Sequence, residues 1–354
     1  MKKNKITLLL GAGFAKYMHG IGTSEINELF AKDTKYLESY NGEQMSLYKY
    51  VESVLSDSFY DLSFETFLAF LEQVLDYRLG EDYNERTSTR DRSLSSVMLR
   101  PNVCFASCNL ISQGIQSLWR TYVHYINTLI KAIANYDCLN DYGDESVVFQ
   151  EFISMLMDSF DKVKIYSTNY DTLCPQLFVD KNIFTSTVNI PNNGLEEYYV
   201  YDLKEFNDRP LTYFPLHGSI KIKRDHFNTI KYCLYEQYLP DYAIDNSAGN
   251  PNGPTLFTPI ISGYNKLQHI SGKPFVFGLQ AFGNDLQDSD TVITLGYSYS
   301  DAHINSYIST FSNVKVISVT MDPVMGLPID LQIDERVMDL ASFFDYYLHS
   351  TKRM

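Results

Sequence analysis

The sequence predicts an α/β fold in which a Rossmann-like parallel sheet carries a large helical insertion. The apolar run at residues 6–10 meets Gly11 and Gly13 and is followed by helix-compatible residues. This pattern is typical of a buried strand that turns sharply into a helix. Three later apolar runs also end in clusters of polar residues. Because strand carboxyl ends in an open parallel sheet converge on one crevice, the four ends predict a single ligand site.

The first strand end has features of a nucleotide-phosphate site. Gly11, Ala12, Gly13 and Phe14 precede a predicted helix whose N-terminal amides would face an anion. Lys16 stands where the six-residue dinucleotide fingerprint has its third glycine, so this motif is incomplete. The prediction of a site therefore depends on the other strand ends, which are YSTNYDTL at residues 166–173, PLHGSI at 215–220 and LGYSYSDAH at 295–303.

Length and composition limit the class of protein. We expect the 354 residues to form a single domain over 1–354 with a substantial core. A net charge of −14 argues against a nucleic-acid or anionic-membrane surface, since both demand positive charge. The five cysteines include no C-x-x-C pair, so neither a disulfide framework nor a zinc site is indicated. We expect a soluble cytoplasmic protein without a metal.

The first half of the chain is expected to be mostly helical. Apolar residues recur at helical spacing between Phe64 and Leu75, and again between Val148 and Phe160. We therefore expect a helical insertion over 34–160, between the first and second strands of the sheet. His124 lies in a long periodic stretch and is expected to be a satisfied helix histidine.

The second half supplies the remaining strands. Residues 162–171 turn from apolar to polar, and a strand at 211–216 ends at His217. The β-branched runs at 291–296 and 314–320 flank a helix that begins at Ser300 and Asp301, which predicts a βαβ unit.

The remaining segments are expected to lie at the surface or the end of the chain. Residues 241–255 are rich in Asn, Gly and Pro and predict a mobile loop, and His226 is expected to be exposed. We expect a C-terminal helical tail over 330–354, with an amphipathic helix at about 336–349.

Taken together, these motifs resemble a known family. Gly-Ala-Gly-Phe, Thr-Asn-Tyr-Asp, His-Gly-Ser, and Gly-Tyr-Ser with a following Asp and His are similar to the sirtuin-like NAD-consuming fold, in its bacterial antiphage-defence branch. FETFL at residues 64–68 and TPIISGYNKL at 258–267 also resemble that branch. The resemblance implies an NAD glycohydrolase that releases nicotinamide and ADP-ribose as the toxic effector of an abortive-infection system.

The resemblance also implies two catalytic residues. Asn169 would lie against the nicotinamide ribose, where its amide can orient the ribose hydroxyls or an attacking water. His217 would be the general base or contact a ribose hydroxyl, and a histidine can accept a proton near neutral pH. Two structural alternatives remain open: a local turn in which Asn169 and Asp171 bond their own backbone, and a buried core role for His217.

The remaining residues implied by the resemblance would bind NAD. Gly11, Ala12, Gly13 and Phe14 would line the pyrophosphate and nicotinamide side, with the Phe14 ring packing over the nicotinamide. Thr168 and Asp171 belong to the second motif, and Asp171 would face the carboxamide. The last motif would approach the adenosine phosphates, although two of its members could instead cap a helix; its residues are Gly296, Tyr297, Ser298, Asp301 and His303.

Other functions and partners follow from the same comparison of motifs. The chain lacks the C-x-x-C zinc module of the protein deacylases, which favours hydrolysis over deacylation. The alternatives are an NAD-dependent deacylase or ADP-ribosyltransferase, or a non-catalytic nucleotide-binding subunit. We expect a homo-oligomer in which the helical insertion and the terminal helix mediate self-association, with Phe343 and Phe344 either at the contact or, as the alternative, in the core. We also expect a regulatory partner such as a translocase-type ATPase or a nucleotide-processing subunit.

Overall fold

The computed structural model describes most of the predicted elements. The described residues are 3–55, 62–86, 115–136, 143–178, 187–189, 197–199, 203–224, 230–232, 260–262, 266, 275–324 and 333–350. All four predicted strand ends fall within these ranges. His226 and the loop predicted at 241–255 lie outside them.

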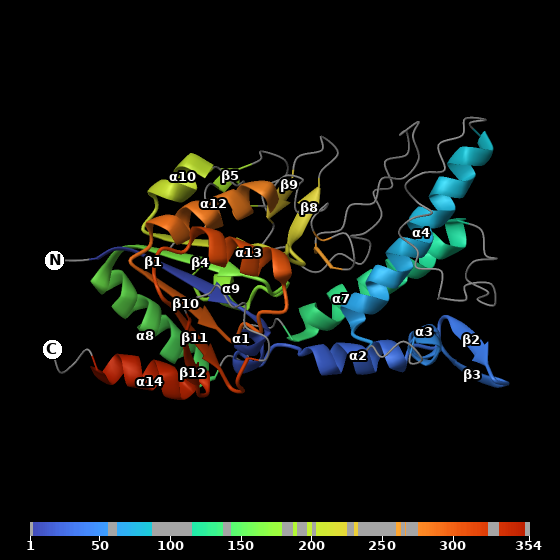
Figure 1. Ribbon diagram of the computed structural model, residues 1–354, viewed down its shortest axis with the longest axis horizontal. Helices are drawn as coiled ribbons and strands as arrows, with labels where there is room; N and C mark the ends of the chain where they lie inside the picture. The colour runs from blue at the N-terminus through green and yellow to red at the C-terminus, as the bar shows by residue number, and fades with distance from the viewer. Residues whose placement is uncertain are drawn as a thin grey trace.

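A six-stranded parallel sheet forms the centre of the fold (Figure 1). Its strands are β1 (Lys3–Leu10), β4 (Phe160–Ser167), β7 (Leu211–Pro215), β10 (Thr291–Leu295), β11 (Val316–Thr320) and β12 (Ile333–Val337). The order is β12-β11-β10-β1-β4-β7, and every pair is parallel. From β1 the chain adds β4 and then β7 on one side of the sheet. It then returns to the other side of β1, where it adds β10, β11 and β12 in that order. This is the Rossmann-like strand order, with the switch point between β1 and β10, and it confirms the predicted fold class.

Helices cover both faces of this sheet. They are α1 (Ala12–Tyr17), α8 (Asp144–Ser159), α10 (Leu203–Asp208), α12 (Phe275–Asp288), α13 (Ala302–Phe311) and α14 (Leu340–Ser350). Figure 1 shows α10, α12 and α13 above the sheet and α8 and α14 below it. Because both faces are covered, residues 6–10 of β1 are all buried without alternation, and Leu8, Leu9 and Leu10 are fully buried. The sheet and these helices are called the sheet body below.

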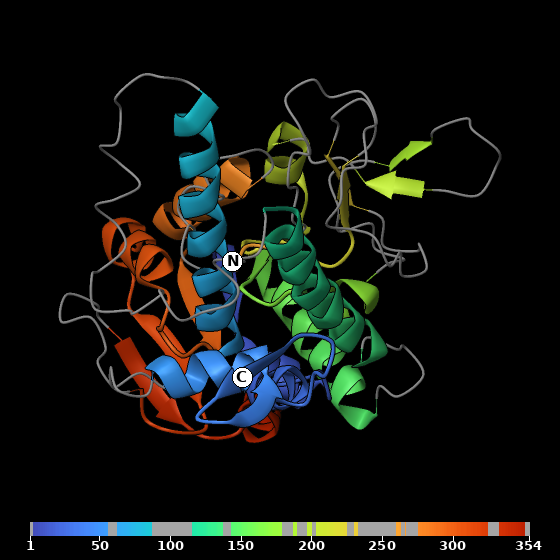
Figure 2. The same cartoon turned by 90° about the vertical axis from the view of Figure 1, so that its right-hand side faces the viewer.

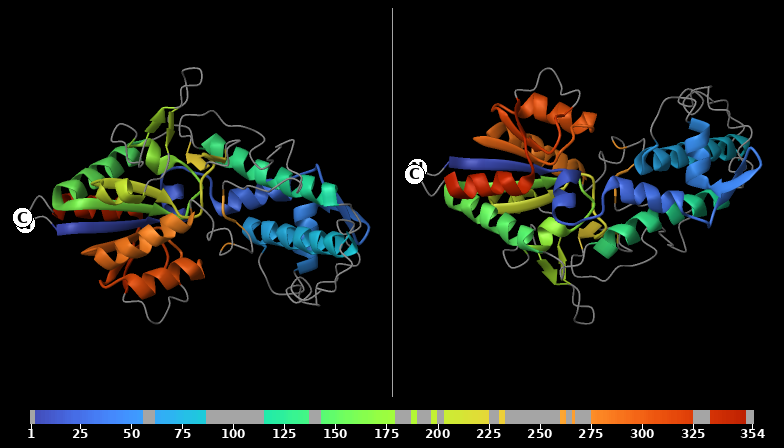
Figure 3. Two further views of the ribbon diagram at one scale, coloured as in Figure 1. Left: turned by 90° about the horizontal axis from the view of Figure 1, so that it is seen from above. Right: turned by 90° about the horizontal axis from the view of Figure 1, so that it is seen from below.

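A second hydrophobic core lies to one side of the sheet body (Figures 1 and 3). It belongs to α2 (Thr23–Ala31), β2 (Leu37–Tyr40), β3 (Glu43–Ser46), α3 (Leu47–Leu55), α4 (Phe64–Arg86) and α7 (Ile115–Tyr136), which together are called the helical subdomain. The two long helices, α4 and α7, contact each other (Figure 2). The rings of Phe30 and Phe67 lie 5.0 Å and 4.7 Å from the ring of Tyr125, and this aromatic cluster fixes how the helices pack.

The helical subdomain differs in extent from the insertion expected at 34–160. It already begins with α2, whose Ile26 and Phe30 belong to the second core, and it contains the β2–β3 hairpin. At the other end, α8 contacts β4 and α14, and its Phe149 and Phe152 belong to the core of the sheet body. Helical periodicity identified these helices correctly but carries no information about which core each apolar face meets.

A small sheet and a short helix complete the described structure. The strands β5 (Thr187–Asn189), β6 (Glu197–Tyr199), β9 (Ile230–Tyr232) and β8 (Ile222–Arg224) form a small antiparallel sheet in that order, and α9 (Leu173–Gln176) follows β4. Across the described ranges, every helix is too short or too polar to cross a membrane.

The C-terminal segment is a strand followed by a helix. Residues expected to begin the tail helix, Arg336 and Val337, instead belong to β12 at the edge of the sheet. Phe343 and Phe344 in α14 are fully buried, and the Phe344 ring lies 4.8 Å from the ring of Phe152 in α8. The expectation that these phenylalanines mediate self-association is therefore wrong, because α8 already covers them.

The burial of α14 predicts a stability effect. Phe344→Ala should lower the free energy of unfolding by about 3–5 kcal/mol, since it removes a fully buried ring. Tyr346→Ala on the exposed side of the same helix should change it by less than about 0.5 kcal/mol. Urea denaturation of both variants measures the difference. If Phe344→Ala had the stability of the wild type but a lower oligomeric state, Phe344 would belong to a subunit interface and not to the core.

Candidate active site

The switch point of the sheet is closed by backbone contacts between glycines. The amide of Gly11 donates to the Leu295 carbonyl at 3.0 Å, and the amide of Gly13 donates to the Gly296 carbonyl at 2.9 Å. A Cβ atom at Gly11 would lie 2.5 Å from the Gly296 oxygen, and Gly296 itself has a φ of +61°. Only glycine permits this approach. The Gly13 amide is therefore engaged by protein here, and not directed at an anion as the sequence suggested.

A cavity of about 340 Å³ lies where the strand ends of the sheet body meet the helical subdomain. Its volume falls in the usual range for small-molecule sites. Most of the predicted site residues line it, namely Ala12, Thr168, Asn169, Asp171, His217, Tyr297, Ser298 and Asp301. The helical subdomain contributes the facing wall, which includes Ile26, Ser63, Phe64, Glu65, Ile133 and Tyr136. The fold thus brings residues from four strand ends to one cavity.

Phe14 has a different place from the one expected. Its ring is buried in the core of the sheet body, 4.7 Å from the ring of Phe149 in α8. The helical turn of α1 directs Phe14 toward α8, whereas Ala12 and Ala15 line the cavity. The expectation that Phe14 packs over a nicotinamide ring is therefore wrong.

Asn169 is fixed at the end of β4 by contacts on two strands. Its backbone amide donates to the Ser167 hydroxyl at 3.0 Å, and its side-chain Nδ2 donates to the Gly11 carbonyl at 2.9 Å. The neighbouring amide of Thr168 donates to the Leu10 carbonyl at 3.0 Å. These bonds hold the Asn169 amide group at the cavity wall between the ends of β1 and β4.

Asp171 forms a local turn, which was one of the two structural alternatives left open by the sequence. Its Oδ1 atom accepts the backbone N–H of Leu173 at 3.1 Å, two residues along the chain. This is an Asx turn, which leads into α9. The motif Thr-Asn-Tyr-Asp therefore combines a cross-strand contact by Asn169 with a local turn at Asp171, and both side chains still border the cavity.

His217 lies at the end of β7 and is almost completely buried. Its Nε2 atom is 3.0 Å from Nε2 of His303 and 4.0 Å from Oδ1 of Asp301. Burial lowers the pKa of His217 to about 3; the Asp301 carboxylate acts in the opposite direction, while Lys266 and His303 lower it further. Burial also lowers the pKa of His303. Both imidazoles are therefore neutral at physiological pH.

The His217 ring meets polar groups on two sides. Its Nε2 atom contacts Nε2 of His303, and a hydrogen bond with the Thr168 backbone raises the pKa of His217 against the effect of burial. The orientation of the His217 ring is thus set by contacts on both sides.

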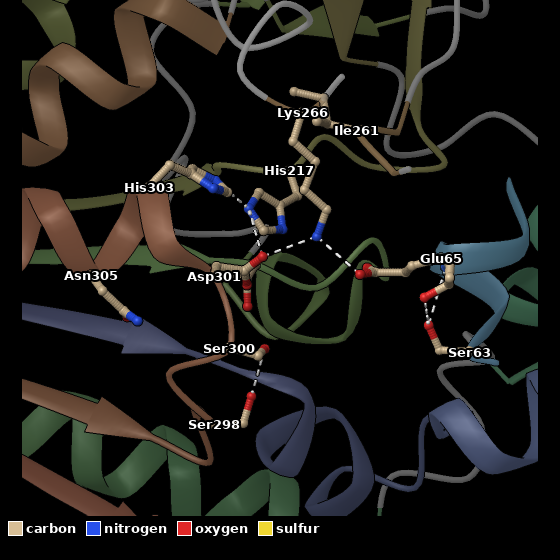
Figure 4. A network of polar contacts seen from close by, with 12 residues as sticks. Ser63, Glu65, His217, Ile261, Lys266, Ser298, Ser300, Asp301, His303 and Asn305 are labelled. Atoms are coloured by element: carbon tan, nitrogen blue, oxygen red, sulfur yellow. Dashed lines mark hydrogen bonds and ion pairs between the residues drawn. The ribbon is translucent and has the colours of Figure 1, made fainter. Parts of the chain in front are cut away.

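A lysine joins the two walls of the cavity. Nζ of Lys266 lies 2.9 Å from Oδ1 of Asp301 and 2.9 Å from Oε2 of Glu65 (Figure 4). The Tyr170 hydroxyl donates to Oε1 of Glu65 at 2.8 Å. Burial lowers the pKa of Lys266, but the carboxylates of Glu65 and Asp301 outweigh it, so the pKa is raised. Burial likewise raises the pKa of Asp301, but the Lys266 ammonium beside it outweighs this effect, so that pKa is lowered and the pair is ionised.

The loop between β10 and α13 is braced in a strained conformation. Tyr299 has a φ of +57°, which is unusual for a residue with a side chain. Its carbonyl accepts from Nδ2 of Asn305 at 2.7 Å, and the Tyr297 hydroxyl donates to Oδ1 of the same asparagine at 3.0 Å. Asn305 therefore holds the loop that carries Asp301 and His303.

Three side chains form an arrangement that could hold a metal ion. The ligand atoms of His217, Asp301 and His303 all lie within 4.8 Å of one another. The missing C-x-x-C pair therefore does not by itself exclude a metal site, because the fold joins two histidines that are far apart in sequence. Two imidazoles and a carboxylate suit Zn²⁺. The Lys266 ammonium, 2.9 Å from Asp301, opposes a cation at this position, so metal-free function stays a prediction.

Three further site residues were not predicted: Glu65, Lys266 and Asn305. Glu65 and Lys266 fall in the segments FETFL and TPIISGYNKL, which were noted only as points of resemblance. A glutamate in the first turn of a helix is usually explained by the helix dipole, so its type alone gave no signal. Asn305 lies within α13 and gave none either.

Comparisons with known proteins give a distant similarity. No family model matches the sequence, and no curated protein matches it. Among solved structures, the chain is similar to a mutant Sir2 homologue in complex with 2'-O-acetyl ADP-ribose, with 12% identity, a TM-score of 0.42, and coverage of 99% of this chain and 92% of that chain.

Two more solved structures show the same level of similarity. A mutant Sir2 homologue in complex with ADP-ribose has 11% identity and a TM-score of 0.42, over 99% of this chain and 92% of that chain. Sir2Tm bound to a propionylated peptide has 11% identity and a TM-score of 0.39, over 99% and 94%. Strand order and cavity position define the class independently: a Rossmann-like α/β protein with a ligand cavity between its strand ends and a helical subdomain.

The contact between His217 and His303 leads to a prediction about the metal content of the protein. We expect purified protein to contain no stoichiometric metal and to keep its thermal midpoint in the presence of a strong chelator, because Lys266 already neutralises Asp301. Elemental analysis and thermal unfolding measure this. One zinc per chain in the wild type, absent from His303→Gln, would show that the three side chains form a metal centre.

The buried histidine also predicts a pH dependence of stability. His217 binds a proton near pH 3 when folded, whereas an unfolded histidine binds one near pH 6.5. Between these values the unfolded chain holds more protons, so the free energy of unfolding should fall as pH decreases from about 6.5 toward 3. His217→Asn should reduce this slope, because it removes the buried imidazole. Urea denaturation at several pH values measures it, and equal slopes in the wild type and the variant would contradict the assignment.

Proposed function

We propose that the protein binds NAD in this cavity and hydrolyses it to nicotinamide and ADP-ribose. The observation that carries the proposal is that the Asn169 amide and the neutral His217 imidazole line one cavity at the carboxyl ends of a Rossmann-like sheet. Ligands of such sheets bind at these ends, near the switch point. The motif resemblance supplies the choice of NAD.

The reaction requires little acid catalysis. The bond between C1' of the ribose and the ring nitrogen breaks, and its electron pair goes to the nitrogen, so nicotinamide leaves as a neutral base. A water molecule attacks C1' and releases a proton, giving ADP-ribose. The protein has to hold the ribose and the water in place and shelter a cationic transition state.

The site residues suit these tasks. One Nδ2 hydrogen of Asn169 is used by Gly11, which leaves the second hydrogen and the side-chain oxygen for ribose hydroxyls or for the water. His217, with a pKa of about 3, is neutral before the reaction and stores no proton, so its role here is to position neighbouring groups at the cavity wall. The Asp301 carboxylate borders the cavity, but its charge is paired with Lys266, so we assign it a positioning role beside His217.

Local groups would hold the remainder of the dinucleotide. Because the net charge is −14, its phosphates need nearby donors, and we assign them to the turn at Ala12 and to the Ser298 hydroxyl. In place of Phe14, the apolar wall of the helical subdomain would accommodate a ring, through Phe64 and Ile133.

The biological role in this proposal is that of an antiphage effector. Removing NAD from the cytoplasm is lethal, so the activity has to be gated by self-association or by another protein. The partner classes implied by the resemblance are a translocase-type ATPase and a nucleotide-processing subunit. Sequencing the neighbouring open reading frames tests this part of the proposal.

Replacing Asn169 tests the catalytic assignment. Asn169→Ala should reduce conversion of NAD to nicotinamide and ADP-ribose by at least about 100-fold, because positioned donors at a reacting centre contribute effects of this size. Asn313→Ala at the surface is the matched control and should retain activity. Chromatography of the products measures both.

The alternatives give distinct results in the same assay. Nicotinamide release that depends on an acylated peptide would indicate a deacylase, and labelling of a protein acceptor would indicate an ADP-ribosyltransferase. Binding of NAD without turnover, alone and with a partner, would indicate a non-catalytic nucleotide-binding subunit and would refute hydrolysis.

A further inference from the structure

The Lys266 ammonium is shared between carboxylates of two separate bodies. Asp301 begins α13 in the sheet body, and Glu65 lies in the first turn of α4 in the helical subdomain. Each is 2.9 Å from Nζ of Lys266, and Figure 4 shows the lysine between them. This arrangement is called the Lys266 bridge below.

The burial of the Lys266 bridge separates it from ordinary surface ion pairs. The side chains of Lys266 and Asp301 are 16% and 14% exposed, and that of Glu65 is 36% exposed. By comparison, Lys32 and Glu28 on α2 form a pair of which both side chains are largely exposed. Exposed pairs contribute little, whereas loss of one partner from a buried set leaves an uncompensated charge. The bridge is therefore a specific constraint on the cavity.

Both ends of the bridge are tied to the predicted catalytic residues. Oδ1 of Asp301, the atom that binds Lys266, is also the atom 4.0 Å from Nε2 of His217. At the other end, Glu65 accepts from Tyr170, which directly follows Asn169 in the chain. The Tyr170 hydroxyl is also 3.2 Å from the Ile261 carbonyl. A shift of Lys266 would therefore reach both His217 and the end of β4.

We propose that Lys266 and Glu65 are positioning residues that couple the helical subdomain to the catalytic site through the Lys266 bridge. The proposal rests on the NAD hydrolase function given above. Neither residue has to touch the reacting atoms. Lys266 fixes Asp301 beside His217, and Glu65 fixes Lys266 while holding the start of α4 as one wall of the cavity.

The electrostatic consequence has a definite sign. The groups that face His217 are Asp301, Lys266, His303 and the Thr168 backbone. Lys266 lowers the pKa of His217 and Asp301 raises it, so removal of the lysine leaves the carboxylate uncompensated. The pKa of His217 should therefore rise in Lys266→Met. It should fall in Asp301→Asn.

A double-mutant cycle over Lys266→Met and Glu65→Gln tests the bridge. Each single variant should lower kcat for NAD by about 10-fold, since misplacement of catalytic groups has effects of this order. The double variant should be no worse than Lys266→Met alone, because Glu65 acts through the lysine. Lys266→Arg should recover part of the activity. Lys32→Met and Glu28→Gln on the surface pair are the controls and should behave as wild type.

A second measurement does not depend on turnover. Imidazole NMR titration of His217 should show its pKa higher in Lys266→Met than in wild type, and calorimetry should show weaker ADP-ribose binding in Glu65→Gln. Independent, additive effects of the two substitutions, or an unchanged His217 pKa in Lys266→Met, would refute the proposal. If Lys266→Met does not fold, Lys266→Arg and Glu65→Gln decide by the same two measurements.

The outcomes separate this inference from the function on which it rests. Wild-type protein that binds ADP-ribose but leaves NAD intact refutes the hydrolase, while the titration and the binding measurements still decide whether the Lys266 bridge exists. Wild-type protein that hydrolyses NAD, with both single variants equally active, refutes the bridge and leaves the hydrolase standing.

Discussion

The backbone contact of Gly11 and Gly13 with Gly296 is the constraint on which the rest of the site depends. It joins β1 to β10 at the point where strand order reverses, and a Cβ atom at any of the three positions would overlap the facing backbone. The Gly11 carbonyl anchors Asn169, and the loop after Gly296 carries Asp301. Asn169 on one side of the candidate site and Asp301 on the other are therefore both positioned by this contact. The distance between them depends on the close backbone approach that the three glycines allow.

The sequence predicted those features that depend on neighbours in the chain. The strand ends at Asn169 and His217 were found because a buried strand has to be apolar and a ligand site has to be polar, so the change of composition marks the edge of the sheet. The direction of a side chain around a helix is a different kind of information. Phe14 was assigned to a ligand by the resemblance of its motif, and Phe344 to an interface by the apolar face of its helix; neither the motif nor the face shows what covers the ring.

Contacts between distant segments explain most of what the sequence did not predict. Lys266 pairs with residues 201 and 35 positions away, and His217 meets His303 across 86 positions. Each is a single residue in an unremarkable context, and no periodicity marks it. Such pairs become visible only after strand order has been established, since that order decides which loops share an edge of the sheet.

The two separate cores have a consequence for the mechanics of the chain. Apolar burial is concentrated inside the sheet body and inside the helical subdomain, and few apolar residues of the strand ends, such as Tyr170, Ile220 and Ile260, join the second core. A change of angle between the bodies would disturb polar contacts at the seam more than either core. A ligand that fills the cavity would contact both the sheet body and the helical subdomain, and it would therefore oppose a change of angle between them. By thermodynamic reciprocity, a partner that holds the two bodies at the same angle would increase the affinity of the cavity for this ligand.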